Sequence, residues 1–350
     1  MNAPLQVGII GSGVIAPTHV RAYQALPDVQ VRWVCDLVEE KARRTAAEFG
    51  IPNVTTDSND VFTDPRVDAV SICTDHASHA PLTIAALDAG KHVLCEKALA
   101  ATAEGLDRMV SAGCRHPELV FGGVFQHRFD PVYRRLKEVL TDGELGAVLT
   151  SGVQVRCLRP GSYYRADKWR GTWEQEGGAV LINQAIHFLD ILNWISGDIQ
   201  ALCGTHANLT HGPDLEAEDT AVAILRFANG SLGTLEATCS SHINWEPTLS
   251  VHGENGSIEI RNGIPAKVAF ADDDRENEIL RTLNAPLDTD PSISGKSYYG
   301  GGHASQLRDF VDAIREKRSP LVTFESAAST VRLVLGIYRS HRENRWIALG

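Results

Sequence analysis

The stretch GIIGSGVIA, residues 8–16, decides the fold of the first part of the chain. It follows an apolar run that is typical of a strand, and it opens a helical pattern. Gly11 permits a tight turn, Gly13 lets a pyrophosphate approach the backbone at the helix N-terminus, and Ala16 allows close packing of helix on strand. We therefore predict a dinucleotide-binding turn here, with a glycine turn that serves packing alone as the alternative.

The acidic residue after the second strand-like run bears on the choice of dinucleotide. Asp36 lies 20 positions after Ala16, near the spacing of the acid that binds a ribose 2′-hydroxyl. Its carboxylate accepts hydrogen bonds from a free ribose and repels a 2′-phosphate, and no basic residue follows before Lys41. We expect NAD rather than NADP, with an exposed loop acid as the alternative interpretation. The residues expected to bind the cofactor at this end are Gly11, Gly13, Val14, Ile15 and Asp36.

Short apolar runs alternate with helical patterns over the first 125 residues. The runs lie at residues 5–10, 29–35, 67–73, 91–95 and 119–125. Strands rich in Val, Ile and Leu and separated by helices form a parallel sheet that is covered on both faces. We therefore predict a Rossmann domain with a doubly wound parallel sheet over residues 1–125.

Beyond residue 125 the pattern changes to consecutive strand-like segments. FANGSL, residues 227–232, places Asn229 and Gly230 between two alternating runs, which is a hairpin signal. We predict an α+β domain with an open, largely antiparallel sheet over residues 126–350, and an α/β fold class for the chain. Residues 271–302, acidic and then rich in Pro, Ser and Gly, are expected to form a long surface loop.

Composition excludes several classes of protein. The net charge of -11 argues against nucleic acid as a partner, and no apolar run reaches the length of a membrane span. The start, MNAPLQVGIIG, leads into a strand without a basic n-region or cleavage site, so we expect a cytoplasmic protein. The seven cysteines form no C-x-x-C pair, and we expect reduced thiols and no metal site.

Two further strand ends carry polar residues, and ligands of such sheets bind beyond the carboxyl ends of strands. CTDHASHA, residues 73–80, supplies Thr74, Asp75, His76 and His79. Thr74 and Asp75 suit helix capping, and the histidines suit an ordinary first turn. We favour contact of this segment with the nicotinamide half and include all four residues in the cofactor-binding set.

HVLCEKALA, residues 92–100, places Glu96 and Lys97 at the end of a buried strand. A partly desolvated lysine near a nicotinamide and an acid can have its pKa tuned for proton transfer. A salt bridge at the rim is an equally good interpretation from position alone. We include both residues in the cofactor-binding set.

GGAVLINQAIHFLD, residues 177–190, is an apolar helical pattern that carries Asn183, His187 and Asp190. Positions i, i+4 and i+7 share one face of a helix, so these polar groups are expected to line up. A buried histidine held by satisfied neighbours is one interpretation. The wall of an active site is the other.

In combination, these segments resemble the Gfo/Idh/MocA family, named for glucose–fructose oxidoreductase, inositol dehydrogenase and a rhizopine-catabolism protein. The resemblance spans nearly the whole chain and is carried by GIIGSGVIAPTH, HASHAPLTIAALDAGKHVLCEKALA, GGAVLINQAIHFLD, EDTAVAILRFANGSLGTLEAT and GHASQLRDFVDAIREKRSPLV. It implies a Rossmann domain followed by an α/β domain with an open sheet. It also implies NAD(P)-dependent oxidation or reduction of a sugar or cyclitol carbon by a homodimer or homotetramer, with the C-terminal sheet as the subunit contact.

The resemblance assigns roles to particular residues. Lys97 matches the active-site lysine of the family, and His187 matches the histidine of its second motif. We expect these two to be the catalytic pair, with Asn183 against the substrate and Asp190 beside them. Ala98 stands where the family has proline, which removes a fixed φ and any preference for a cis peptide next to Lys97. Asn183 replaces the common aspartate and cannot act as a base, which shifts proton chemistry to the catalytic pair.

Further candidates for substrate contact come from three segments. FQHRF (125–129) offers Gln126 and Arg128, and YGGGH (299–303) ends in His303, for which a helix N-terminus is the alternative. GSYYRADKWRGTW (161–173) supplies aromatic and cationic residues that suit a sugar ring and an anionic group, although a packed loop or an oligomer contact explains them equally well. Its candidates are Tyr164, Arg165, Trp169 and Arg170.

We therefore predict an NAD-dependent dehydrogenase or reductase that acts on a sugar, a cyclitol or a nucleotide sugar. Two alternatives are an NAD-retaining glycoside hydrolase that uses transient oxidation, and a non-catalytic ligand-sensing regulator. The regulator is the weaker alternative because both Lys97 and His187 are present.

Overall fold

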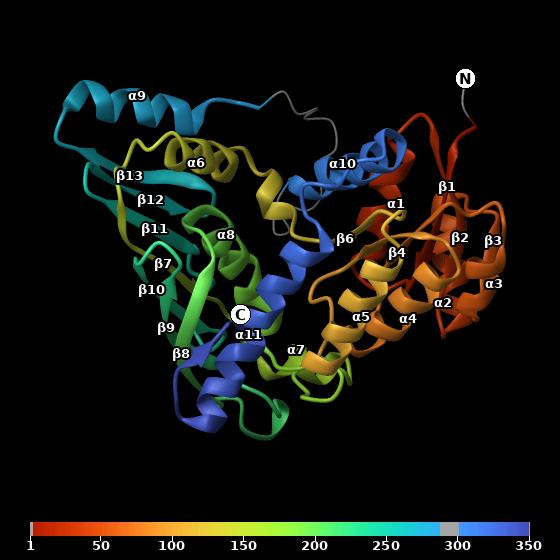
Figure 1. Ribbon diagram of the computed structural model, residues 1–350. Coiled ribbons are helices and arrows are strands. Elements are labelled where there is room, and N and C mark those ends of the chain that lie inside the picture. Colours follow the sequence, from red (N-terminus) through yellow and green to blue (C-terminus); the bar gives the residue numbers. More distant parts are fainter. Residues whose placement is uncertain (1–2, 288–300, 350) are drawn as a thin grey trace. The chain divides into compact units, whose positions relative to one another are not determined.

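The computed structural model describes residues 3–287 and 301–349 (Figure 1). Contacts divide these residues into two compact units. The first unit runs to Gln126 and includes residues 301–328, and the second begins at His127 and includes residues 329–349. The chain therefore leaves its first unit, returns to it, and leaves it again.

The first unit contains a six-stranded parallel sheet in the order β3-β2-β1-β4-β5-β6. Its strands are β1 (Leu5–Ile10), β2 (Val29–Cys35), β3 (Asn53–Thr55), β4 (Ala69–Ile72), β5 (His92–Cys95) and β6 (Phe121–Gly123). The predicted doubly wound Rossmann sheet is confirmed. The order reverses between β1 and β4, which is the switch point where such sheets bind ligands. The sequence analysis missed only β3, a short edge strand of three partly buried residues.

Six helices of the described residues belong to the first unit. They are α1 (Ala16–Gln24), α2 (Glu39–Phe49), α3 (Ser58–Thr63), α4 (His76–Asp88), α5 (Ala103–Arg115) and α10 (Gly302–Glu316). Helix α10 packs against α1, although nearly the whole second unit separates the two in the sequence. The predicted domains, 1–125 and 126–350, place residues 301–328 in the second domain. In the structure these residues pack in the first unit.

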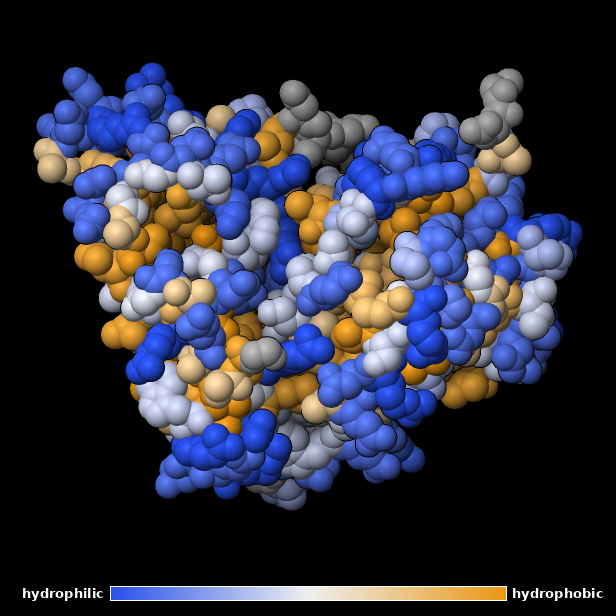
Figure 2. Space-filling view, in the orientation of Figure 1, coloured by the Kyte–Doolittle hydropathy of each residue, from blue (hydrophilic) through white to orange (hydrophobic). Residues whose placement is uncertain are grey.

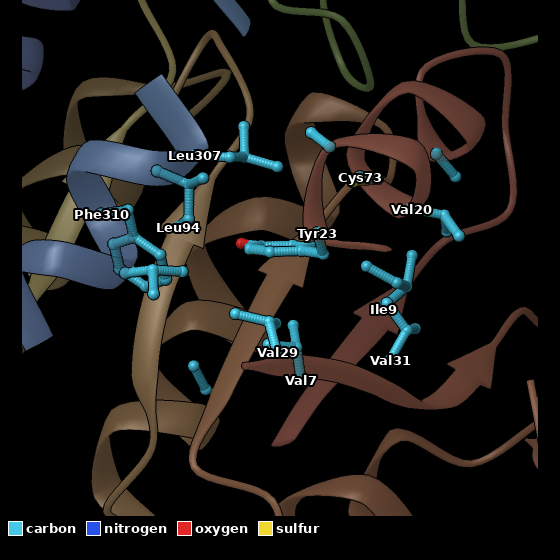
Figure 3. Packing of buried hydrophobic residues seen from close by; sticks show 14 of the residues in the cluster. Val7, Ile9, Val20, Tyr23, Val29, Val31, Cys73, Leu94, Leu307 and Phe310 are labelled. Atoms are coloured by element: carbon cyan, nitrogen blue, oxygen red, sulfur yellow. The ribbon is translucent and has the colours of Figure 1, made fainter. Parts of the chain in front are cut away.

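The core of the first unit explains this return of the chain. Figure 3 shows Tyr23 of α1 lying across a cluster in which strand residues such as Val7 meet Leu307 and Phe310 of α10. Leu307, Phe310 and Tyr23 are each at most 1 % exposed. Burying a side chain of this size contributes about 1.5–3 kcal/mol, so α10 is an integral part of the core.

The second unit is built on an eight-stranded sheet in the order β13-β12-β11-β7-β10-β9-β8-β14. The strands are β7 (Val148–Arg156), β8 (Ile199–Ala207), β9 (Thr220–Phe227), β10 (Leu232–Thr238), β11 (Thr248–Gly253), β12 (Gly256–Arg261), β13 (Ile264–Phe270) and β14 (Ile347–Ala348). All neighbours are antiparallel except β7 and β10. The predicted hairpin is confirmed: β9 and β10 pair across Asn229 and Gly230, and Gly230 takes the φ of +87° that the turn requires.

Helices of the second unit cover this sheet and extend beyond it. They include α6 (Pro131–Thr141), α7 (Gly161–Ala166), α8 (Ile186–Ser196), α9 (Asp273–Asn284) and most of α11 (Phe324–Glu343). Helix α9 corrects the expected loop over residues 271–302, of which residues 288–300 lie outside the described part. Asp272 caps α9 by accepting hydrogen bonds from the Asp274 and Arg275 N–H groups, so the acidic run marks a helix N-terminus. Across residues 3–287 and 301–349, no helix combines the length and apolarity that a membrane crossing needs.

Candidate active site

The glycine turn after β1 has a shape that only glycine permits. Gly11 has a φ of +94°, and a Cβ at this position would lie 2.7 Å from the carbonyl carbon and oxygen of Cys73. The Gly11 N–H donates to the Cys35 carbonyl at 2.7 Å. The turn is thereby locked between the ends of β2 and β4, and any side chain at residue 11 would push these strand ends apart.

The next part of the turn leaves room for a ligand. A Cβ at Gly13 would meet only the Cys73 carbonyl oxygen, at 3.9 Å, and Val14 is 67 % exposed. Ile15 is the N-cap of α1 and provides no side-chain cap for the first turn. The buried Ser12 hydroxyl has no hydrogen-bond partner among the described residues. Open space over donors at a helix N-terminus fits the pyrophosphate of a dinucleotide.

Asp36 lies at the end of β2 with its carboxylate turned to the glycine turn. It accepts hydrogen bonds from the Ser12 N–H and the Val38 N–H, each at 2.8 Å. Each carboxylate oxygen retains a second acceptor site, so Asp36 can still accept from a ligand hydroxyl. This position fits a ribose with a free 2′-hydroxyl and disfavours a phosphate there.

The residues that follow β4 form hydrogen bonds through their side chains. Asp75 caps α4 by accepting from the Ser78 N–H at 3.1 Å, which is the structural alternative considered for it. His79 is fully buried, and its Nδ1 lies 2.7 Å from the Ala98 carbonyl oxygen. Burial lowers the pKa of His79. The His76 side chain is also buried, whereas Thr74 is partly exposed.

The end of β5 carries a buried carboxylate next to Lys97. Ile72 of β4 pairs with Cys95 of β5, so the ends of the two strands lie side by side at the switch-point edge of the sheet. Glu96 accepts from the Lys97 N–H at 3.1 Å and from His19 Nε2 at 2.9 Å. Its side chain is 8 % exposed, which rules out a salt bridge at a solvent rim. The peptide between Lys97 and Ala98 is cis even though proline is absent.

The environment of Glu96 has opposing effects on its acidity. Burial raises the pKa of Glu96, whereas the hydrogen bond and charge of His19 and the charges of His303 and Lys97 lower it, with a net value of about 2. Glu96 is therefore an anion throughout the physiological range. Lys97 is only partly buried, and its charge acts on Glu96.

The second unit presents the other polar segment. Its helix begins as a π-helical turn, Val180–Ala185, and continues as α8. Asn183 and His187 are both partly exposed, so they share the accessible face that the sequence pattern predicts. Asp190 does not belong to that face, because it is fully buried. π-Helical turns inside helices are frequent at functional sites.

Two buried glutamates hold the turn that precedes this helix. Glu218 accepts from the Ala179 N–H at 3.0 Å, the Leu181 N–H at 2.9 Å and the Tyr338 hydroxyl at 2.9 Å. Burial raises the pKa of Glu218 to about 7, although these hydrogen bonds favour its carboxylate. Glu176, also fully buried, accepts from the Asn183 side-chain amide.

His127 faces the polar segment, and the sequence analysis passed over it. Its ring lies edge-on to the ring of His187 with centroids 5.5 Å apart, and its Nδ1 is 2.5 Å from an Asp130 oxygen. The chosen neighbours Gln126 and Arg128 are each only 2 % exposed. Residues 126–129 form a 3-10 helix, so strand alternation gives no signal for His127, and its contact with His187 becomes visible only in the structure.

Arg128 and Asp190, both expected at the substrate, instead bind each other. The guanidinium donates to both carboxylate oxygens, at 2.8 Å and 2.6 Å, and the Thr330 hydroxyl donates to the same carboxylate at 2.7 Å. Neither side chain is more than 3 % exposed. A bidentate pair without solvent access stabilises the interior of the unit and does not fit direct substrate contact.

The aromatic and basic segment at 161–173 divides into buried and accessible parts. Tyr164 is buried with its hydroxyl 3.1 Å from Cys239 Sγ, so packing accounts for it. Arg170 lies over the rings of Tyr163 and Trp169, at 4.4 Å and 5.0 Å from their centroids. Arg165 pairs with Asp214 and is largely exposed.

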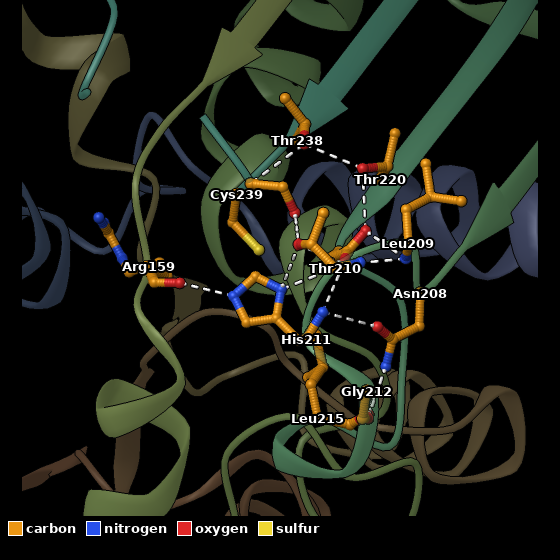
Figure 4. Close-up of polar contacts among 12 residues, drawn as sticks. Arg159, Asn208, Leu209, Thr210, His211, Gly212, Leu215, Thr220, Thr238 and Cys239 are labelled. Carbon is orange, nitrogen blue, oxygen red and sulfur yellow. Dashed lines mark hydrogen bonds and ion pairs between the residues drawn. The ribbon is translucent and has the colours of Figure 1, made fainter. Parts of the chain in front are cut away.

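A hydrogen-bonded loop anchors this segment to the sheet (Figure 4). His211 Nε2 lies 2.6 Å from the Arg159 carbonyl oxygen, and His211 Nδ1 lies 3.1 Å from Asp219. Asp219 also accepts from the Thr210 N–H at 2.8 Å. The His211 ring therefore connects Asp219 to the Arg159 backbone, and this connection fixes the start of the segment 161–173.

His303 lies in the first turn of α10 and belongs to the first unit. It is 4 % exposed, and its Nε2 is 3.9 Å from a Glu96 oxygen. This placement fits the alternative of a residue at a helix N-terminus and not a side chain that reaches a substrate. Groups of three or more His, Cys, Asp or Glu that could hold a metal ion do not occur among the described residues.

The first unit defines a class of protein. Its Rossmann sheet, with a glycine turn and an acid at the end of β2, provides for a dinucleotide. These features define an NAD-dependent oxidoreductase.

Comparison with known families agrees with this class. Residues 5–123 match the model of an oxidoreductase family's NAD-binding Rossmann fold, and residues 137–349 match that of its C-terminal alpha/beta domain. The chain belongs to the Gfo/Idh/MocA family of oxidoreductases. The expected family, fold class, oxidoreductase activity and NAD cofactor are confirmed.

Known relatives cover the whole chain at modest identity. A myo-inositol 2-dehydrogenase of Thermotoga maritima is 26% identical over 99% of this chain and 98% of its own length. A levoglucosan dehydrogenase of Pseudarthrobacter phenanthrenivorans is 29% identical over 98% and 97%. The WlbA dehydrogenase of Bordetella pertussis, solved in complex with NADH and UDP-GlcNAcA, superposes with a TM-score of 0.88 at 26% identity over 100% of this chain and 99% of its own.

Proposed function

We propose that the protein is an NAD-dependent dehydrogenase or reductase that acts on a hydroxyl or keto carbon of a sugar, a cyclitol or a nucleotide sugar. The observation that carries the proposal is Lys97, which follows the buried anion Glu96 at the same edge of the sheet as the glycine turn. The relatives support the substrate class, because their names refer to inositol and levoglucosan and one was solved with a UDP-sugar.

Lys97 and His187 are the proposed catalytic residues. In the oxidising direction the substrate hydroxyl loses its proton to one of these two side chains, and the reverse reaction returns it. NAD, when bound, would supply the hydride acceptor for the same carbon. Lys97 also holds the reacting oxygen, since an ammonium donates hydrogen bonds and stabilises developing negative charge. Asn183 hydrogen-bonds a neighbouring hydroxyl, and His127 with Asp130 supports the His187 ring.

The proposed cofactor contacts follow the geometry of the first unit. The backbone around Gly11, Gly13, Val14 and Ile15 receives the pyrophosphate, and Asp36 receives the ribose. The backbone of Thr74 to His76 contacts the nicotinamide half. Asp75, His79 and Glu96 contribute indirectly, because their side chains hold the strand ends in place.

The proposed substrate contacts in the second unit are Asn183, Trp169, Arg165 and Arg170. The indole supplies an apolar surface for a sugar ring, and the two guanidinium groups supply charge for a carboxylate or phosphate. A location in the cytoplasm is part of the proposal, and it is supported by seven free cysteines, most of them buried.

A homodimer or homotetramer through the large sheet completes the proposal. Exposed apolar residues alternate with buried ones along β9 and β10, and hydrophobic colour interrupts the polar surface over the strands of this unit (Figure 2). Val222, Ile224 and Leu232 are 46 %, 49 % and 54 % exposed. Such a patch favours a second subunit. Light scattering after size exclusion should give two or four chains, and Ile224→Glu should yield monomers.

The decisive experiment measures absorbance of reduced nicotinamide. The purified protein is mixed with NAD or NADP and a panel of hexoses, inositols, uronic acids and nucleotide sugars. A signal with one sugar class, stronger with NAD, is expected. Silence across the panel together with NAD released by denaturation would instead favour the glycoside hydrolase alternative. Silence without bound nucleotide would contradict the proposed substrate class.

A further inference from the structure

A chain of buried polar side chains runs through the first unit and ends at Glu96. The Tyr23 hydroxyl lies 2.8 Å from Ser71 Oγ, Ser71 Oγ lies 3.1 Å from His19 Nδ1, and His19 Nε2 lies 2.9 Å from Glu96 Oε1. Tyr23, Ser71 and His19 are fully buried. None of these three was singled out from the sequence, because each occurs within an otherwise ordinary apolar pattern.

The chain joins four separate parts of the unit. His19 and Tyr23 come from α1, the helix that the glycine turn opens, and Ser71 comes from the middle of β4. Glu96 follows β5, and His303 of α10 lies 3.9 Å from it on another side. The cofactor helix and the lysine segment therefore share one polar connection.

One direction of donation satisfies every hydrogen in the chain. Burial keeps the pKa of Tyr23 well above its usual value, so the phenol retains its proton and donates it to Ser71. The Ser71 hydroxyl then donates to His19 Nδ1, which leaves the Nε2–H to donate to Glu96. This assignment holds for a neutral His19 imidazole, and it gives that ring one defined tautomer.

Burying these polar groups destabilises the fold unless each group keeps its hydrogen-bond partner. A buried hydroxyl or imidazole that loses its partner costs about 1–3 kcal/mol, whereas apolar side chains of similar shape pack at no such risk. All four residues of β4 are buried, so an apolar residue would suit position 71 equally well for packing. The polar chain does what apolar packing cannot do, which is to supply a fixed hydrogen bond to Glu96.

We propose that His19, oriented by Ser71 and Tyr23, is a positioning residue of the reaction: it holds Glu96 as an oriented carboxylate, which fixes the Lys97 backbone and favours the charged form of its side chain. The inference rests on the proposed catalytic role of Lys97. The titratable groups around Glu96 are His19 of α1, His79 of α4, His303 of α10, Lys97, and the buried thiols Cys73 and Cys95. The thiols remain protonated, because burial raises the pKa of each.

The first measurement needs no substrate. Nitrogen NMR of histidine-labelled full-length protein, with the His19 signal assigned from its absence in His19→Gln, reports which ring nitrogen carries the proton. We expect an unprotonated Nδ1 and a protonated Nε2 at neutral pH. A protonated Nδ1 would overturn the donor chain and the inference with it.

The second measurement is the pH dependence of kcat/KM with a substrate identified by the panel. His19→Leu removes the donor to Glu96, so protonation of the buried carboxyl enters the assay range. We expect kcat to fall about 10- to 100-fold, as for a small misplacement of a catalytic group, and the acidic limb to move to higher pH by about one unit or more. His19→Gln retains a donor that can reach Glu96 and should restore most of both properties.

A matched control separates this effect from a general loss of a histidine. His116 also pairs with a carboxylate, Asp88 at 2.9 Å, in the same unit but near the surface. His116→Leu should leave the pH profile and kcat unchanged. Binding of NADH, followed by fluorescence, should stay within about twofold for His116→Leu and His19→Gln, because both variants keep a donor to Glu96.

The outcomes distinguish this inference from the proposed function. If Lys97→Met keeps full turnover, the catalytic assignment is wrong whatever His19 does. If Lys97→Met is inactive while His19→Leu keeps the wild-type pH profile and kcat, only the positioning role is wrong. A loss of kcat in His19→Leu without a shift of the acidic limb, or without recovery in His19→Gln, would reduce His19 to a structural residue.

Discussion

Two buried glutamates support the two proposed catalytic side chains, one in each unit, and they differ in what surrounds them. Glu96 holds the Lys97 segment, and Glu218 holds the turn that leads to His187. Both are almost or completely inaccessible to solvent. Nevertheless the pKa of Glu96 is about 2, whereas that of Glu218 is about 7.

The difference shows that the partners of a buried carboxyl matter more than its burial. Glu96 faces an imidazole donor and positive charges, which favour the anion. Glu218 receives hydrogen bonds only from backbone N–H groups and the neutral phenol of Tyr338, which offset its desolvation incompletely. One unit therefore keeps a permanent anion beside its proposed catalytic residue, and the other holds a group that titrates near neutral pH.

The largest expected effect comes from removing the side chains that the glutamates support. Lys97→Met and His187→Ala should each lower kcat by about 10²- to 10⁴-fold, the range of general acid–base catalysis, while NADH binding stays nearly intact. Steady-state kinetics and cofactor fluorescence test both statements. Normal turnover in both variants would show that Glu96 and Glu218 support structural residues and not catalytic ones.

The second prediction concerns stability against pH, where the two glutamates should differ in sign. The folded pKa of Glu218 lies above its ordinary value of 4.5, so the folded state binds more protons and stability falls as pH rises from about 4.5 to about 7. The effect is on the order of 3 kcal/mol. Glu96 has the opposite shift, so its contribution is fully present above about pH 4.5 and is lost only as pH falls towards 2.

Urea unfolding between pH 5 and pH 8 tests this prediction. Glu218→Gln should remove most of the decline in the free energy of unfolding, while Glu96→Gln should leave its slope unchanged. Glu254 offers a control, because it is an exposed glutamate that also accepts a backbone N–H, from Ala147 at 3.1 Å. Equal slopes in wild type and Glu218→Gln would show that Glu218 titrates normally.

The smallest effect should come from two buried tyrosines. Tyr23 donates to Ser71 in the chain that ends at Glu96, and Tyr338 donates to Glu218. Tyr23→Phe and Tyr338→Phe each remove one buried hydroxyl, and we expect each to cost about 1–2 kcal/mol of stability. Only Tyr338→Phe should also change the pH dependence between pH 5 and 8, because its hydroxyl binds Glu218 directly. Thermal melting at several pH values separates the two, and parallel pH curves would contradict this distinction.

Local patterns predicted the parts of the fold that depend on neighbours in sequence. The glycine turn, the alternation of strands and helices, and the Asn229-Gly230 hairpin are of this kind. The predicted loop includes the acidic run that begins α9 because this run precedes a segment rich in Pro, Ser and Gly, whereas acidic residues at a helix N-terminus stabilise the helix.

The features of the site that the sequence did not predict depend on contacts between residues far apart in the chain. Arg128 and Asp190 were candidates because a charge in an apolar segment suggests function, and their pairing over 62 positions is visible only in the fold. The same holds for His19 and Glu96, which lie 77 positions apart. The contact of His127 with His187, 60 positions away, is likewise visible only in the fold.

The return of α10 to the first unit has a consequence for how the protein is made. The face of α1 that carries Val20 and Tyr23 is completed by residues that begin at Gly302, 278 positions after Gln24. At about 5–20 residues per second, a ribosome needs roughly 14–56 s to deliver them. During that time the nascent Rossmann sheet has its strands but lacks one covering helix. The apolar face of α1 therefore stays without its partner helix until α10 has been synthesised.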